Sequence, residues 1–469
     1  MSFALYLLYV FMTFFRPVEM YAPDLASLRP MLTLSMVCLF LSWRNVRAGS
    51  PIAARNIHFK LFFGFCTMIS LSQIANDGGP NGALQAINEF TPSIMLFVLT
   101  VLNVNTLDRL QKTCLATIIG LVIAAGYGIS AFHTGERWTD LVMIQKHPDH
   151  DLDDMSKAPP FDAPANDDSG WYVFRVRSLG PLSDPNDFAQ AMVMALPMLM
   201  GLYRKGQLLR NLMLIGAPGG ILFYAIKLTQ SRGAQIGIGA ALLVGSLKLF
   251  GLKKTLIGAV VMGVLVSAGS IGGTKREISG KDKSSEDRIL SWSSGVDMLG
   301  NNPIFGVGYG NFEDNNPVDH LTAHNSFVLC FAELGLSGYF IWMGLIALTI
   351  KCVTSCTRPP NPPNTEVSQM AVLLLAAMAG FFTCGWFLSR TYQSTLYFLL
   401  ALCIACWHIS ETQRDEETAP KSAELLPPTS NPAMEDKRLS WRLGALIGMA
   451  ITFAVVEGFI INQQMSPSE

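Results

Sequence analysis

The stretch Asp287–Gly338 reads DRILSWSSGVDMLGNNPIFGVGYGNFEDNNPVDHLTAHNSFVLCFAELGLSG, and long apolar segments precede and follow it. It begins as a polar run, continues with glycines at alternate positions, and passes through His324-Asn325-Ser326 into an apolar segment. A polar segment that ends in a histidine immediately before a membrane-length apolar run places a titratable side chain at the start of a membrane helix. We therefore interpret this stretch as the working part of the chain, which the surrounding helices hold in place.

The composition is that of a membrane protein. The 469 residues are 50% hydrophobic and 15% charged, which lies outside the usual range of soluble globular proteins. Because a transmembrane helix needs roughly 20 mostly apolar residues, the apolar segments amount to about 12–13 helices. We expect an all-α polytopic membrane protein with a long extracytoplasmic loop that carries short amphipathic helices.

Lysine and arginine gather in alternate loops between the apolar segments, as at Arg44, Arg47 and Arg55 and again at Lys351 and Arg358. The positive-inside rule assigns these loops to the cytoplasm and the intervening loops to the opposite side. We expect N-terminal helices in 1–132, a first extracytoplasmic loop in 133–187, central helices in 188–271, a catalytic extracytoplasmic loop in 272–323, C-terminal helices in 324–408, a disordered cytoplasmic linker in 409–442, and a final helix and tail in 443–469.

The second outer loop is rich in positive charge, although its side of the membrane should be poor in it. Its cations predict an anionic ligand; they are Lys275, Arg276, Lys281, Lys283 and Arg288. Arg288 also begins an amphipathic pattern in which Ile289, Trp292, Val296 and Leu299 share one helical face. Such a helix can lie on the bilayer with Arg288 at its edge.

Arg232 follows Thr229-Gln230-Ser231 with hardly any loop between two apolar segments. An arginine at membrane depth is costly unless it is paired or faces water, which makes Arg232 a functional candidate; the alternative is an arginine that snorkels to lipid headgroups. Earlier in the chain, Pro185-Asn186-Asp187 predicts a turn that caps a helix beginning near Phe188. Asn186 either belongs to this cap alone or also lines the site.

The run Pro303–Phe312 contains glycine at every second position from Gly306 to Gly310. Glycine allows sharp turns and a close approach of the backbone to a ligand, so Gly306, Gly308 and Tyr309 are candidate substrate-binding residues. The spacing does not match a dinucleotide-binding motif.

His324 stands directly before the apolar helix of the opening stretch. Either Asn325 or Ser326 can cap this helix, which directs the positive end of its dipole toward the imidazole. Oriented N–H groups beside a titratable base suit a phosphate-bearing substrate.

Two histidines, His147 and His150, lie among aspartates in the first outer loop. Imidazole and carboxylate can bind zinc or manganese. The interpretation that we favour is a flexible, solvated acidic loop without a metal.

The order of these motifs resembles the O-antigen ligase and polymerase superfamily. Ser231-Arg232-Gly233 stands at a helix start, Arg288 and Trp292 precede the glycine run, and nine residues separate His324-Asn325 from a Gly-x-x-Gly motif. The resemblance implies a glycosyltransferase of the bacterial inner membrane that works at the periplasmic face without a metal ion or other cofactor. Its implied donor is an undecaprenyl-diphosphate-linked glycan, and its implied reaction inverts the anomeric carbon.

The resemblance also implies roles for individual residues. Arg232 and Arg288 would hold the donor diphosphate, and His324 would activate or orient the acceptor hydroxyl. We expect Asn325, Asn186 and the loop cations to contact substrate, and we expect membrane lipids, but no nucleic acid, as further partners.

The acceptor is left open by the sequence. It is lipid A core for a ligase, which we favour, the growing glycan for a polymerase, and a protein serine for an O-oligosaccharyltransferase. A different class, a polysaccharide transporter or flippase, would place charges near the middle of its helices. Here the candidate charges fall at one face, which favours surface chemistry.

Overall fold

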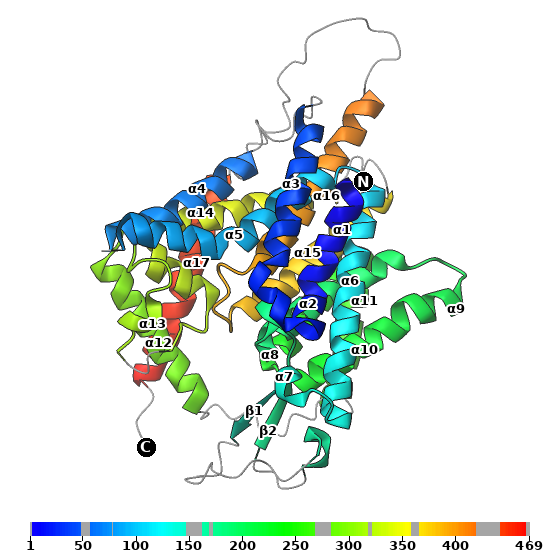
Figure 1. The fold of residues 1–469 in the computed structure, drawn as a ribbon, viewed down its shortest axis with the longest axis horizontal. Coiled ribbons are helices and arrows are strands. Elements are labelled where there is room, and N and C mark those ends of the chain that lie inside the picture. Colours follow the sequence, from blue (N-terminus) through cyan, green and yellow to red (C-terminus); the bar gives the residue numbers. More distant parts are fainter. Residues whose placement is uncertain are drawn as a thin grey trace, which may run out of the picture. The chain divides into compact units, whose positions relative to one another are not determined.

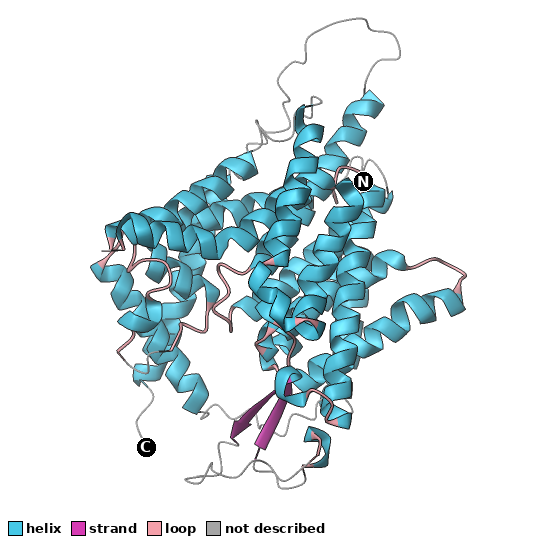
Figure 2. Cartoon of the chain, viewed as in Figure 1, coloured by secondary structure: helices cyan, strands magenta, loops and turns pink. Residues whose placement is uncertain are grey.

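The computed structural model describes residues 2–47, 57–76, 78–146, 162–167, 172–267, 283–317, 321–357, 365–418 and 441–465. Helices make up most of these ranges, and the single sheet within them has two strands (Figure 2). The predicted all-α class is therefore confirmed.

Eight described helices are long and apolar enough to cross a membrane, and two shorter apolar helices, Ser2–Phe15 and Pro30–Trp43, accompany them. The eight are Ile57–Ala75, Gly79–Asn103, Leu107–Thr134, Leu208–Thr229, Ser326–Ser355, Glu366–Gly385, Ser394–Arg414 and Trp441–Gln463. The other expected spans coincide with helix α8 (Pro185–Leu199) and with α11 (Arg232–Ser267), which is interrupted at Gly251. The chain is thus a multi-pass membrane protein.

The chain divides into two compact units, each built from separated segments, and Figure 1 labels their elements. Unit 1 contains Met1–Arg44, Asp108–Glu277 and Val372–Cys384. Besides α8, α11 and part of α15 (Thr365–Gly385), its elements are α1 (Ser2–Phe15), α2 (Pro17–Tyr21), η1 (Pro23–Leu28), α3 (Pro30–Arg47), α6 (Leu107–Thr134), α7 (Trp138–Leu141), β1 (Val142–Lys146), η2 (Pro164–Asn166), β2 (Tyr172–Val176), η3 (Gly180–Leu182), η4 (Met200–Leu202), α9 (Leu208–Asn211), the π-helical η5 (Leu212–Gly216) and α10 (Ala217–Thr229).

The expected first outer loop, 133–187, contains structure that we did not predict. Strand β1 pairs antiparallel with β2, in a register that runs from Val142 opposite Val176 to Lys146 opposite Tyr172. The strands form because β-branched and aromatic residues are frequent in both and pack well on a pleated surface. In the sequence an acidic segment separates the two strands, and we interpreted the region as a flexible loop.

Helix α8 begins at Pro185, three residues before the expected start at Phe188. The cap is Asp184, whose side chain accepts a hydrogen bond of 2.7 Å from the Asn186 amide. Proline at the first helical position needs no amide partner, which is why the helix starts there. Asn186 is therefore a residue of the first turn rather than the cap itself, and α8 packs against α10 and α11.

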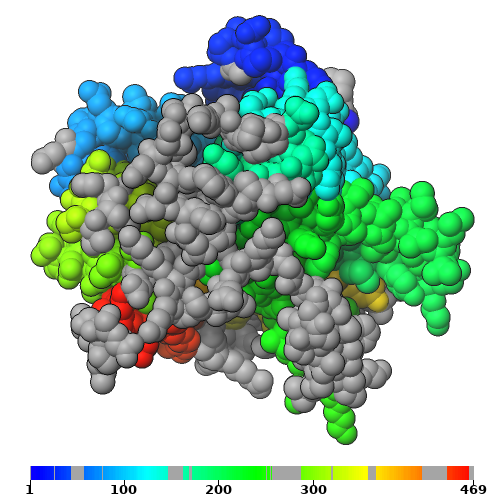
Figure 3. All heavy atoms as spheres, turned by 90° about the horizontal axis from the view of Figure 1, so that it is seen from below, coloured from blue at the N-terminus to red at the C-terminus, as the bar shows by residue number. Residues whose placement is uncertain are grey.

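The apolar surface of α9, η5 and α10 faces outward in unit 1. Leu208, Leu209 and Met213 have exposed fractions of 83%, 75% and 61%. These elements carry the green colour of residues near 210 in the space-filling view (Figure 3). Exposed leucine over a whole helix is typical of contact with lipid.

Unit 2 contains Asn45–Leu107, Ile278–Ala371 and Gly385–Glu469. Its elements are α4 (Ile57–Ala75), α5 (Gly79–Asn103), α12 (Lys283–Asn301), α13 (Phe312–Asn315), α14 (Ser326–Ser355), α16 (Ser394–Thr418) and α17 (Trp441–Met465), together with the remaining residues of α15. Helix α16 continues past the expected end at residue 408 because Glu411, Gln413 and Arg414 are good helix formers. The rest of the expected linker, 419–440, lies outside the described residues.

Helix α14 is central to unit 2, because α4, α12, α16 and α17 all pack against it. Aromatic rings fill the neighbouring interface of α4, α5 and α16, where Phe62 and Phe97 stack with centroids 4.0 Å apart and Tyr397 is fully buried. In a membrane such close packing, rather than hydrophobic exclusion from water, holds helices together. The start of α14 is therefore a fixed point for the site.

Candidate functional site

His324 lies at the start of α14, in a short segment that we call the histidine turn (Ala323–Ser326). Its φ of 49° is in the left-handed region, and the following Asn325 is extended. The Asn325 side-chain oxygen accepts hydrogen bonds from the amides of Phe327 (2.9 Å) and Val328 (3.2 Å). Asn325 is thus the cap, which resolves the alternative between Asn325 and Ser326, and the dipole of α14 points toward His324.

The backbone before His324 is held by Trp292 of α12. The buried indole donates a hydrogen bond of 2.9 Å from Nε1 to the carbonyl oxygen of Ala323. Trp386, which packs against Trp292 and Phe327, extends this aromatic contact to the first turn of α14. A buried indole N–H normally finds such a partner, and here the partner is the residue next to the candidate base.

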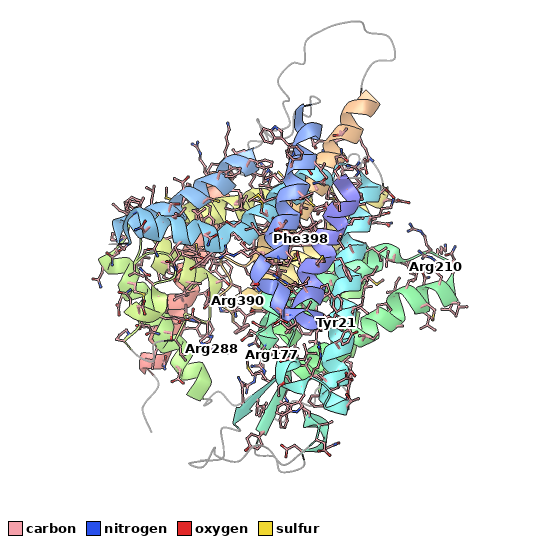
Figure 4. The ribbon with its side chains drawn as sticks, viewed as in Figure 1. Tyr21, Arg177, Arg210, Arg288, Arg390 and Phe398 are labelled. Carbon is pink, nitrogen blue, oxygen red and sulfur yellow. The ribbon has the colours of Figure 1, made fainter. Side chains whose placement is uncertain are left out.

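Arg288 lies one helical turn before Trp292 in α12 (Figure 4). Residues four positions apart in a helix share a face, with β-carbons about 5–6 Å apart. Trp292 bonds to Ala323, the residue next to His324. Arg288 therefore lies on the helix that contacts the histidine turn, one turn from the contacting residue.

The amphipathic interpretation of α12 needs a correction. We expected the face with Trp292 to lie on the bilayer, but α12 packs on α14 and α17. Ser291, Trp292 and Met298 are buried against protein, and the Trp292 ring also contacts Phe459 of α17. The face of α12 with Trp292 therefore covers protein.

A loop after α15 fixes the other side of the histidine turn. Ser326 donates from its hydroxyl to the carbonyl of Leu388 and accepts a bond of 2.9 Å from the Arg390 amide. The Thr391 hydroxyl donates to the Ser326 carbonyl at 2.5 Å. The turn is therefore fastened from two directions, and Arg390 is placed beside it.

The nitrogen of the Asn325 side-chain amide is an unpaired hydrogen-bond donor among the described residues. Asn325 is completely buried, and Nδ2 has no hydrogen-bond partner within the part of the chain that the structure describes. A buried unpaired donor costs about 1–3 kcal/mol, so it needs an explanation. A polar group of a substrate next to His324 would supply the missing acceptor.

The glycine run packs against the break in α14. The amides of Val307 and Gly308 donate to the carbonyls of Ala332 (2.9 Å) and Glu333 (3.0 Å). A β-carbon at Gly306 would lie 2.3 Å from the carbonyl carbon of Glu333, and one at Gly335 would lie 2.4 Å from that of Ile304. These contacts account for glycine at Gly306 and Gly335 by the approach of two backbones, without a ligand.

Tyr309 is fixed by neighbours in α4 and by a second tyrosine. Its amide donates to the Ser72 hydroxyl at 3.2 Å, its carbonyl accepts from the Gln73 side chain, and its ring lies 4.5 Å from that of Tyr392. Burial raises the pKa of both phenols above the usual value, so both stay neutral at physiological pH. Close by, the buried Glu333 accepts the Phe312 amide at 3.2 Å and ties the run to α14.

Arg232 is the first residue of α11 and the last residue of a segment that we call the arginine turn (Thr229–Arg232). Gln230 has a φ of 51°, and the hydroxyl of buried Ser231 accepts the Ala234 amide at 3.4 Å, in the manner of a cap. The Arg232 side chain is half-buried. Like His324, it stands where a left-handed residue and a cap begin a membrane helix.

The arginine turn is held by Arg175 of β2. Arg175 donates from Nε to the Thr229 carbonyl (2.8 Å) and from Nη2 to the Asn186 side-chain oxygen (2.7 Å). Gln230 in turn donates to the carbonyl of Phe174 at 3.2 Å. Asn186 therefore has a partner within unit 1.

The predicted site residues are divided between the two units, and some lie outside the described residues. Arg288, His324, Asn325, Gly306, Gly308 and Tyr309 all belong to unit 2, and Arg232 and Asn186 belong to unit 1. Lys283 is the first residue of α12. Three loop cations, Lys275, Arg276 and Lys281, and the acidic segment His147–Asp154 lie outside the described residues.

Sequence reasoning gave no role to Arg175 or Arg390. Arg390 stands in Leu388-Ser389-Arg390-Thr391 between two apolar segments, so the criterion that selected Arg232 would also have selected it. Arg175 carried no comparable signal, because its importance comes from two contacts that lie 11 and 54 positions away.

Comparison with known families adds one finding. A family model described as O-Antigen ligase matches residues 218–343, which run from α10 into α14 and include Arg232, Arg288 and His324. A search of curated proteins gave no match to the chain. The family match confirms the resemblance to the O-antigen ligase and polymerase superfamily.

Proposed function

We propose that this multi-pass membrane protein, which carries an O-antigen ligase family domain over residues 218–343, transfers a glycan from an undecaprenyl-diphosphate donor to an acceptor hydroxyl. The observation that supports the proposal best is the bond from Trp292 to Ala323, because it joins the helix that carries Arg288 to the residue before His324. We assign this reaction to the periplasmic face of a bacterial inner membrane, in line with the family domain and the charge pattern of the loops.

The arginines are assigned to the donor. Charge develops on the diphosphate as it leaves, and a guanidinium can bind phosphate oxygens with two parallel hydrogen bonds. Arg288 and Arg232 supply this stabilisation in the proposal. Groups that bind the leaving charge more strongly than the resting donor lower the barrier to transfer.

His324 is assigned to the acceptor. The acceptor oxygen attacks the anomeric carbon, the bond from that carbon to the diphosphate breaks, and the hydroxyl proton passes to the imidazole. Attack opposite the leaving group inverts the anomeric carbon. A well-placed general base is ordinarily worth about 10²–10⁴ in rate. Asn325 Nδ2 and the dipole of α14 add donors beside this position.

Single substitutions test the proposal. His324→Ala, Arg288→Ala and Arg232→Ala should each abolish transfer in purified, folded protein supplied with the lipid-diphosphate glycan and candidate acceptors. His133→Ala is the matched control, because His133 bonds to Tyr224 at 2.7 Å on an exposed surface and has no assigned role. Wild-type activity in all three variants would exclude the assignment.

The products of the same assay identify the acceptor. A single shift of lipid A core would establish a ligase, which is the acceptor class that we favour. A ladder of repeats would establish a polymerase, and a modified protein serine would establish an O-oligosaccharyltransferase. Movement of intact donor across vesicles without any transfer would replace the enzyme by a transporter.

A further inference from the structure

We propose that Arg175 is a positioning residue for donor recognition, which holds the arginine turn in the geometry that lets Arg232 bind the donor diphosphate. The inference rests on the proposed function and deepens it. It concerns a residue of the β1–β2 hairpin, and the hydrogen bonds of Arg175 to Thr229 and Asn186 lie within unit 1.

Arg175 is itself poorly placed to bind substrate. Its exposed fraction is 7%, and its Nε and Nη2 atoms are directed to the Thr229 carbonyl and the Asn186 side chain. Both distances, 2.8 and 2.7 Å, are those of strong charge-assisted hydrogen bonds. The guanidinium therefore acts on other residues of the site.

The first bond reaches the end of α10. The Thr229 carbonyl is among the last four of that helix, which have no partner within the helix. Only Gln230 and Ser231 separate it from Arg232, and Ser231 caps α11. Because the turn is so short, the position of the Thr229 carbonyl sets the position of the first residue of α11.

The second bond reaches the first turn of α8. Asn186 follows Pro185, and the α8 start is fixed by the Asp184 cap. Arg175 thus joins the start of α8 to the end of α10, two helices that already pack against each other. A lysine cannot reproduce this arrangement, because it offers one ammonium group where the planar guanidinium offers donors in two fixed directions.

Four variants test the inference in the full-length protein. Arg175→Met should raise the KM for the lipid-diphosphate donor about tenfold, the effect of losing roughly one charge-assisted hydrogen bond, with a smaller change in kcat and an unchanged acceptor KM. Arg175→Lys should recover part of the donor affinity. Asn186→Ala should raise the donor KM, and Asn186→Asp, which keeps an acceptor for Arg175, should raise it less.

Arg177 provides the matched control. It stands two residues from Arg175, and its guanidinium also makes two hydrogen bonds, to the carbonyls of Asp140 (3.0 Å) and Thr139 (3.1 Å). Arg177, labelled in Figure 4, is half-buried, and these bonds join the end of β2 to α7 rather than to the arginine turn. Arg177→Met should leave the donor KM at the wild-type value.

The outcomes separate this inference from the proposed function. If wild-type protein fails to transfer glycan, or His324→Ala, Arg288→Ala and Arg232→Ala all keep wild-type activity, the proposed function itself is wrong. If Arg232→Ala alone transfers normally, the positioning role of Arg175 is wrong while the proposed transfer stands. If those results are as proposed but Arg175→Met keeps the wild-type donor KM, the inference alone is wrong. If Arg175→Met does not fold, the Asn186 pair decides: an equal rise in donor KM for Asn186→Ala and Asn186→Asp overturns the positioning role.

Discussion

The arginine turn of unit 1 and the histidine turn of unit 2 are built on one plan and held by different chemistry. Each has a left-handed residue, Gln230 or His324, followed by a capping residue and a membrane helix. The carbonyl before the left-handed residue accepts a charged guanidinium in unit 1 and a neutral indole N–H in unit 2. Because charge-assisted hydrogen bonds are roughly twice as strong as neutral ones, the two turns should differ in their dependence on these anchors.

The two turns also place their candidate residues differently. Arg232 is the first residue of its helix, whereas His324 is itself the left-handed residue before the cap. A long guanidinium can reach a phosphate from a helical position, but a general base must sit within hydrogen-bond reach of one proton. The histidine turn is accordingly fastened on both sides, by Trp292 and by the loop that contains Arg390.

The largest expected effect comes from His324→Asn. Asparagine tolerates the left-handed conformation but cannot act as the base, so kcat should fall by about 10²–10⁴ with an unchanged melting temperature. His324→Val removes the base too and in addition strains the turn, so it should also lower the melting temperature. Steady-state kinetics and thermal unfolding in detergent measure the two effects. Wild-type activity in His324→Asn would show that His324 is not the general base, and the histidine turn would then have no catalytic role that the arginine turn lacks.

Gly335→Ala tests the support beneath the histidine turn. Gly335 has a φ of 64° and a ψ of −171°, which is accessible almost only to glycine, and an added β-carbon would meet the Ile304 backbone at 2.4 Å. We expect a loss of about 3 kcal/mol in the free energy of unfolding. Gly458→Ala in α17 is the control, since its β-carbon would meet nothing within 4 Å. Equal stability of both variants would contradict the described break in α14.

Trp292→Phe tests the neutral anchor. Phenylalanine keeps an aromatic ring but loses the bond to the Ala323 carbonyl, a loss of about 1 kcal/mol, so transfer should slow by about fivefold. We expect a larger effect for Arg175→Met, because Arg175 donates charge-assisted hydrogen bonds and Trp292 donates a neutral one. Trp441 begins α17, and its ring packs at a tilt against Phe340 of α14; Trp441→Phe should leave the rate unchanged. A larger loss in Trp292→Phe than in Arg175→Met would reverse the comparison.

The smallest effects concern the caps. Asn325 accepts two amides, at 2.9 and 3.2 Å, whereas Ser231 accepts one at 3.4 Å. Asn325→Ala should therefore cost about 1–2 kcal/mol of stability and Ser231→Ala about 0.5 kcal/mol. Asn325→Ser should recover most of the loss. Thermal unfolding of the three variants checks this order. A larger loss of stability in Ser231→Ala than in Asn325→Ala would show that the stabilisation by the caps does not follow the number and length of their hydrogen bonds.

Much of the architecture could be predicted from the sequence because the rules involved are local. Membrane helices follow from the length of apolar runs, and their ends from residues such as Pro185 and the cap before α14. The sheet was missed because Val142–Lys146 and Tyr172–Val176 are short, and their pairing is not local. The sequence suggested that the Trp292 face of α12 lies on the bilayer, whereas it packs against protein. An apolar stripe has the same sequence pattern whether protein or lipid covers it.

The sequence by itself determined that this is an all-α membrane protein and which residues are candidates for anion binding and proton transfer, since hydropathy, charge and motif order need no knowledge of distant contacts. Tertiary structure alone decided that Trp292 fastens the backbone beside His324 and that Arg175 fastens the turn before Arg232. The two hydrogen bonds join residues that are 31 and 54 positions apart in the sequence. Packing directs each side chain toward its partner, and no local sequence pattern contains that information.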